Sequence, residues 1–100
     1  KGIWGVTNMT NGIDMRTTEG KRQQHICQIL IDRGTTHNGW SLSYTYEVNN
    51  ELFKENGLHD VHIGEMVMCI NIIRMAFGLQ QVYYEMRNGV WEWDYSYPTE

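Results

Sequence analysis

Hydrophobic and polar residues alternate through much of the first half of the chain, which is the pattern of β-strands. From Trp40 to Val48 a large side chain occupies every second position, and the residues between are polar. Gln24–Arg33 carries apolar residues on both faces of an extended chain, which predicts a central strand. Gly2–Met9 and Ile13–Thr18 flank the turn signal Thr10-Asn11-Gly12 and predict a hairpin.

The second half changes to helical spacing. A short helix is expected from Asn49 or Asn50 to Asn56, ended by Gly57 in the left-handed conformation. Apolar residues then recur at helical spacing from about Ile63 to Arg87.

Two glycines, Gly64 and Gly78, fall inside this main helix and predict a kink or a close backbone contact. Val90–Tyr97 returns to strict alternation and predicts a last strand. The chain of 100 residues is thus expected to form a single α+β domain. Its antiparallel sheet would have four to five strands, with one long and one short helix on one face, in the order β-β-β-β-α-α-β.

The main helix carries two apolar stripes, so one sheet cannot cover it. The first stripe contains Met66, Ile70, Ile73 and Phe77, and the second contains Met68, Ile72, Met75, Leu79, Val82 and Met86. The second stripe is covered either by another part of the chain or by the same helix in a homodimer. We therefore treat it as a candidate oligomer interface.

The last strand combines aromatic and acidic side chains. Trp91, Trp93, Tyr95 and Tyr97 share one face, and Glu92 and Asp94 lie on the other. Large aromatic residues often anchor protein interfaces, and the carboxylates would attract a basic partner. Two other interpretations remain open, namely the core face of an edge strand and a platform on which single-stranded bases stack.

The net charge and the cysteine content limit the partners and the cellular compartment that we expect for this protein. Eight Lys and Arg against twelve Asp and Glu give a net charge of −4, which disfavours direct binding of duplex nucleic acid. Two cysteines do not make a disulfide framework, and no apolar run is long enough for a membrane span. These features indicate a reducing, cytoplasmic setting, with no cofactor and no membrane contact.

Metal binding and catalysis have weaker support in the sequence. His25 and Cys27 could meet His59 and His62 in a zinc site, with Asp60, Glu65 or Cys69 as substitutes. The spacing matches no Cys-x-x-Cys or His-Glu-x-x-His motif, however. The carboxylates Glu65, Glu85, Glu92 and Asp94 show no spacing that singles out a catalytic pair.

These observations favour a small acidic, non-enzymatic protein that works by stoichiometric contact with another protein. The expected partner is basic or associated with nucleic acid, as for antitoxins, immunity proteins or anti-defence accessory proteins of viruses and phages. The alternatives are a self-assembling structural component, a zinc- or thiol-dependent small enzyme, and a carrier of a small apolar ligand.

Overall fold

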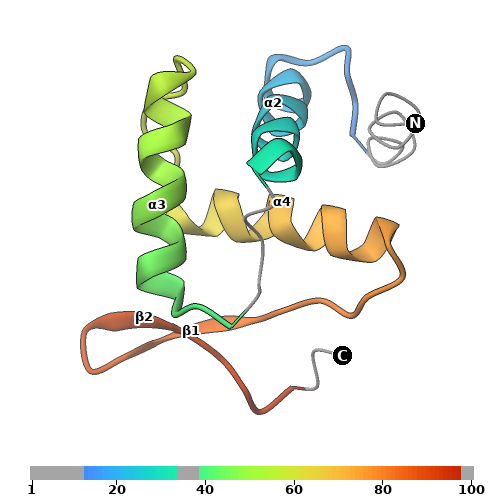
Figure 1. The fold of residues 1–100 in the computed structure, drawn as a ribbon. Helices are drawn as coiled ribbons and strands as arrows, with labels where there is room; N and C mark the ends of the chain where they lie inside the picture. Colours follow the sequence, from blue (N-terminus) through green and yellow to red (C-terminus); the bar gives the residue numbers. More distant parts are fainter. Residues whose placement is uncertain (1–12, 34–38, 98–100) are drawn as a thin grey trace.

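Three helices and one two-stranded hairpin make up the described part of the chain. The computed structural model describes residues 13–33 and 39–97. Within these residues the elements are α2 (Thr18–Arg33), α3 (Leu42–Glu55), α4 (Ile63–Ala76), β1 (Tyr84–Arg87) and β2 (Val90–Trp93) (Figure 1). The expected sheet of four to five strands and the order β-β-β-β-α-α-β are therefore wrong, although the fold remains α+β. The expected strand Gly2–Met9 and the Thr10-Asn11-Gly12 turn lie outside the described residues.

Helix α2 replaces the strand expected at Gln24–Arg33. Its buried residues Ile26, Cys27, Ile29 and Leu30 follow a helical period, so the apolar positions that looked two-sided in a strand form one helical stripe. The strand expected at Ile13–Thr18 is also wrong. Those residues form a turn in which the Asp14 carbonyl accepts hydrogen bonds from the backbone N–H and the hydroxyl of Thr17.

Helix α3 replaces the strand expected at Trp40–Val48 and includes the predicted short helix as its second half. The Ser41 hydroxyl caps its first turn by accepting a hydrogen bond from the Tyr44 N–H at 3.1 Å. Its buried side chains are spaced by three or four residues over most of the helix and are Leu42, Thr45, Asn49, Leu52 and Phe53. Because two of these are polar, the helical stripe is not visible as a hydrophobic pattern.

Helix α4 begins at Ile63 as predicted but ends at Ala76, eleven residues before Arg87. Gly78 has a φ of +78° and is the left-handed residue of the helix end, not an interior kink. Around it the Leu79 N–H donates to the Arg74 carbonyl at 2.8 Å, and the Gly78 N–H donates to the Met75 carbonyl at 3.1 Å. These two bonds form the Schellman motif, which terminates the helix.

Strands β1 and β2 pair in an antiparallel hairpin through the Asn88-Gly89 turn. Both turn residues have positive φ, as a two-residue type I′ turn requires. The register places Tyr84 opposite Trp93 and Met86 opposite Trp91, so these four side chains share one face of the hairpin. The expected strand Val90–Tyr97 is thus confirmed only for its first four residues.

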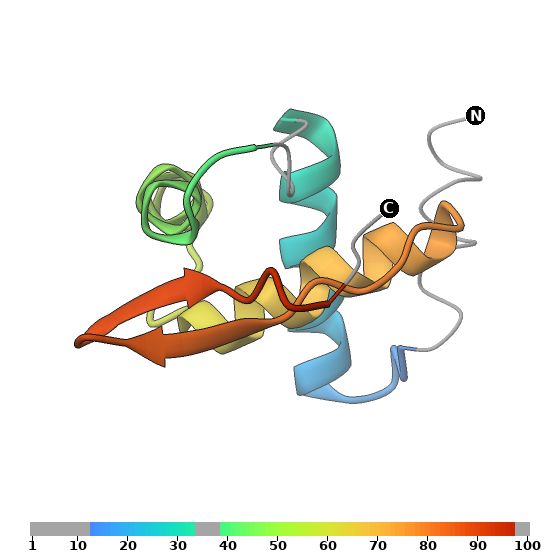
Figure 2. The ribbon, with the colours of Figure 1, turned by 90° about the horizontal axis from the view of Figure 1, so that it is seen from below.

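The helices and the hairpin enclose one core. Helix α2 packs against α4 and α3, and β2 packs against α3. Seen from below, the hairpin lies along α4, with β2 on the side of α3 and β1 on the outer side (Figure 2). Phe53 and Met66 are fully buried at the centre, and the Trp93 indole N–H donates to the Trp40 carbonyl at 2.9 Å, which fixes the hairpin to the start of α3.

Candidate functional site

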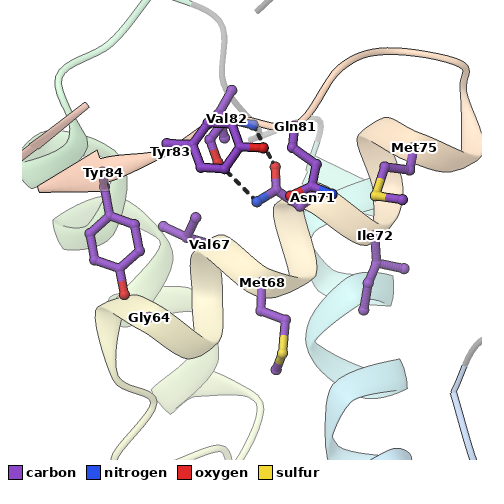
Figure 3. A pocket seen from close by; sticks show the side chains of 10 residues that line it. All are labelled: Gly64, Val67, Met68, Asn71, Ile72, Met75, Gln81, Val82, Tyr83 and Tyr84. Carbon is purple, nitrogen blue, oxygen red and sulfur yellow. Dashed lines mark hydrogen bonds between the residues drawn. The ribbon is translucent and has the colours of Figure 1, made fainter. Parts of the chain in front are cut away.

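An apolar groove lies between α4 and the chain segment that leads into β1. Its volume is about 400 Å³, and it is open to solvent. Figure 3 shows that both α4 and the segment 81–84 contribute side chains to it. The lining residues are Gly64, Val67, Met68, Asn71, Ile72, Met75, Gln81, Val82, Tyr83 and Tyr84. None of these lining residues carries a charged side chain.

Helix α4 supplies one wall because it has apolar residues on two sides. Met66, Cys69 and Ile70 are buried in the core. Met68 and Met75 lie on the other side and are 42% and 56% exposed. Methionine is flexible and polarisable, so exposed methionines adapt to apolar partners of different shapes.

The second wall is held in place by Asn71. The Val82 N–H donates to Asn71 Oδ1 at 2.7 Å, and Asn71 Nδ2 donates to the Val82 carbonyl at 3.0 Å. Both backbone groups of Val82 are therefore satisfied by one side chain, and Figure 3 shows this pair across the groove. At the other end the Tyr84 hydroxyl would lie 2.7 Å from a Cβ at Gly64, so the absence of a side chain at Gly64 lets this ring approach α4.

A second hollow adjoins the first and shares Met75, Gln81 and Tyr83 with it. Its volume is about 440 Å³, and Leu79 and Tyr97 complete its apolar lining. The Tyr83 and Tyr97 rings are in contact, with centroids 4.4 Å apart. The apolar surface therefore extends from the middle of α4 past its C-terminal end.

The residues expected to form an oligomer interface do not lie on one helical stripe. Met68, Ile72 and Met75 do lie together on α4, in the groove. The other three follow the end of the helix, so their helical spacing has no structural meaning. Of these, Leu79 and Met86 are exposed, and Val82 is buried in the second wall of the groove.

The expected partner-binding residues of the C-terminal segment do not form one continuous surface. Trp91 and Trp93 share a face of β2, but Trp93 is only 3% exposed and belongs to the core. Trp91 packs edge-on against Tyr84, with ring centroids 5.2 Å apart. Tyr95 and Tyr97 follow the end of the strand and are exposed.

The opposite face of the hairpin is acidic. Glu85 and Glu92 are directly opposite each other in the register, and Arg87 pairs with both carboxylates. Asp94 lies just beyond β2, and the Ser96 hydroxyl and N–H both donate to its Oδ1. These two hydrogen bonds hold the pKa of Asp94 below its ordinary value.

The residues considered for a zinc site do not converge. Within residues 13–33 and 39–97, no group of three or more His, Cys, Asp or Glu side chains is placed to hold a metal ion. His59 and His62 are exposed, whereas Cys27 and Cys69 are buried where α2 meets α4. Glu65 forms an ion pair with Arg22, at 2.7 Å between Oε2 and Nε.

Each buried thiol lies against a backbone carbonyl of the facing helix. Cys27 Sγ is 3.8 Å from the Cys69 carbonyl oxygen, and Cys69 Sγ is 3.8 Å from the Gln23 carbonyl oxygen. A hydrogen bond between the two thiol side chains, together with burial, raises the pKa of the Cys69 thiol far above its ordinary value. This thiol is therefore in its protonated, unreactive form.

Sequence reasoning missed the second wall of the groove because it placed residues 77–87 in a helix. The available signal was Asn88-Gly89 between two short alternating segments, Tyr84–Arg87 and Val90–Trp93, which is the strongest local pattern for a hairpin. Applying it would have ended α4 earlier and brought Tyr83 and Tyr84 across from the methionines. The role of Asn71 has no comparable signal in the sequence.

Among the described residues, no helix has both the length and the apolar character needed to cross a membrane. No family model, curated protein or solved structure matches this chain.

Proposed function

We propose that this protein binds another protein through the groove between α4 and residues 81–84, and acts by stoichiometric contact as a binding protein or inhibitor. The observation that carries the proposal is the exposure of Met68 and Met75 beside a groove without charged lining. Contiguous exposed apolar surface of this kind marks interaction sites, and methionine and tyrosine are enriched in them.

The charge of the chain supports a basic partner. The net charge is −4. The hairpin carries Glu85 and Glu92 on its acidic face, and Tyr84 on its other face lines the groove. An acidic surface of this kind guides a partner of opposite charge toward the molecule and selects against acidic ones. The two free cysteines favour a reducing compartment, and we propose that the protein acts in the cytoplasm.

A matched pair of methionines makes the proposal testable. Met68 in the groove is 42% exposed, and Met15, in the turn before α2 and outside the groove lining, is 41% exposed. Met68→Glu places a charge in the groove while keeping a good helix former, and Met15→Glu adds the same charge elsewhere. Wild type and both variants are immobilised and mixed with extract from the natural source. The proteins that they retain are purified and then mixed in solution with the protein that is not immobilised.

We expect a protein that wild type and Met15→Glu both retain, that Met68→Glu loses, and that forms a one-to-one complex by light scattering. Equal retention by Met68→Glu would contradict the assignment of the groove, and the absence of any stoichiometric complex would contradict the function. If wild type alone forms a dimer that Met68→Glu dissociates, the groove serves self-assembly and the proposed function is wrong.

A further inference from the structure

Strand β1 has one edge that faces away from β2. The Asp94 N–H donates to the Tyr83 carbonyl at 2.8 Å, which extends the β1–β2 ladder by one pair. In an antiparallel pair, alternate residues direct both backbone groups toward the partner strand. The backbone N–H and C=O groups of Tyr83, Glu85 and Arg87 therefore point toward β2. Those of Val82, Tyr84 and Met86 point outward.

Asn71 satisfies only the first of these three outward positions. Its side-chain amide donates to and accepts from the Val82 backbone, as a neighbouring strand would. In the part of the chain that the structure describes, no group makes the equivalent bonds to Tyr84 or Met86. The open edge therefore starts beside the groove and continues toward the hairpin turn.

We propose that the groove and this edge together bind an extended segment of the partner, which adds to β1 as a third strand. The inference rests on the proposed function and specifies its mode of recognition. Side chains of such a strand alternate between the two faces of the hairpin. Those on the face of Tyr84 would enter the groove over Val67 and Met68, so they must be apolar.

Residues on the other face of the added strand would lie beside Glu85. This carboxylate is opposite Glu92, an arrangement of like charges that destabilises a strand pair, and the two share the guanidinium of Arg87. A lysine or arginine next to Glu85 would compensate the remaining negative charge. The segment that fits is therefore one in which apolar and basic residues alternate.

A second copy of β1 fits this edge less well. Antiparallel pairing of Tyr84 with Met86 of another copy would use both outward positions, but it would place the two copies of Glu85 directly opposite each other. Like charges at directly opposed positions disfavour pairing. We therefore assign the edge to a basic segment of a different protein.

Three synthetic hexapeptides test the proposal against the isolated protein by amide NMR titration. The first alternates lysine and valine, the second is the same peptide with N-methyl groups on alternate residues, and the third has glutamate in place of lysine. N-methylation removes the donors that strand pairing needs and leaves the side chains unchanged. Met86→Pro removes one outward N–H without removing a bond to β2, and Met86→Leu is its matched control.

We expect the first peptide to bind, with shifts and slowed hydrogen exchange at the Tyr84 and Met86 amides. The N-methylated peptide should bind the wild type at least about tenfold more weakly than the first peptide does. The first peptide should lose affinity by a similar factor on Met86→Pro. It should bind Met86→Leu as it binds the wild type. The glutamate peptide should not bind. Equal binding of the N-methylated peptide, unchanged Tyr84 and Met86 amides, or no binding of the first peptide at millimolar concentration would overturn the proposal.

The peptide comparison uses the wild-type chain, so it remains decisive even if Met86→Pro fails to fold. It is also independent of the capture experiment with Met68→Glu. A partner that depends on Met68, together with no peptide binding, would contradict strand addition and leave the proposed function intact. Peptide binding without any captured protein would contradict the proposed function alone.

Discussion

Asn71 holds the second wall of the groove, and its removal should destabilise the protein by a measurable amount. Asn71→Ala deletes the acceptor 2.7 Å from the Val82 N–H and the donor 3.0 Å from the Val82 carbonyl. Val82 is only 1% exposed, so water cannot replace both bonds without local opening. With about 1 kcal/mol for each lost bond, and more if a backbone group stays unsatisfied, the free energy of unfolding should fall by roughly 2–3 kcal/mol.

Urea unfolding followed by tryptophan fluorescence measures this change, because Trp93 is buried and becomes exposed on unfolding. Asn71→Asp keeps an acceptor for the Val82 N–H but loses the donor to its carbonyl, so its stability should lie between those of wild type and Asn71→Ala. Gln81→Ala is the surface control, since Gln81 is exposed in the same wall and its substitution should change stability by less than about 0.5 kcal/mol. If Asn71→Ala is no less stable than Gln81→Ala, the wall is held by something other than Asn71.

Three further predictions concern the helix end, the acidic hairpin and the buried thiols. Gly78→Ala forces a side chain into a φ of +78° and should lower the free energy of unfolding by about 1 kcal/mol in thermal or urea unfolding, whereas an unchanged value would contradict the Schellman assignment. The Asp94 carboxyl should titrate by NMR below 3.8, and Ser96→Ala should raise that pKa toward 3.8. Because the pKa of Asp94 is lower in the folded than in the unfolded chain, the stabilisation by the Ser96 hydrogen bonds is present above about pH 4 and is lost as pH falls through the folded pKa. A pKa of 3.8 or more for Asp94 in wild type would refute this prediction. Cys27 and Cys69 should resist a thiol reagent at pH 8 until the protein is unfolded, and rapid labelling of the folded protein would contradict their burial.

The sequence correctly predicted helix ends and the face of one strand. Gly57 ends α3 with a φ of +80°, as expected, and α4 begins at Ile63. Trp91 and Trp93 occupy one face of β2, as their alternation indicated. Each of these features depends on a few neighbouring residues and so can be read from the chain.

The errors arose where burial of polar residues hid the true period. In α3 the core positions include Thr45 and Asn49, so the hydrophobic residues alone, among them Tyr44 at 50% exposure, suggested a strand. Asn49 Nδ2 donates to the Thr45 carbonyl within the helix, at 2.9 Å, and also lies 3.8 Å from Met66 Sδ of α4. The contact with Met66 is set by tertiary packing and cannot be derived from alternation.

The groove was foreseen only on its helical side. Met68, Ile72 and Met75 were recognised as an apolar stripe in need of cover, and they do line the groove. The facing wall depends on the pairing of the Asn71 side chain with the Val82 backbone, which no hydrophobic pattern specifies. The aromatic strand was treated as a candidate partner-binding surface, with the core face of an edge strand left open, and Trp93 does lie in the core.

The most direct test of the central claim is the methionine methyl spectrum of the protein as the captured partner is added to it. Met68 and Met75 report on the groove, Met15 reports on an equally exposed site outside it, and Met66 reports on the core. We predict that the Met68 and Met75 signals shift and reach saturation at one equivalent of partner, while the Met15 and Met66 signals stay in place. Shifts at Met15 with unchanged Met68 and Met75 would show that the partner binds elsewhere and that the groove is not the binding site.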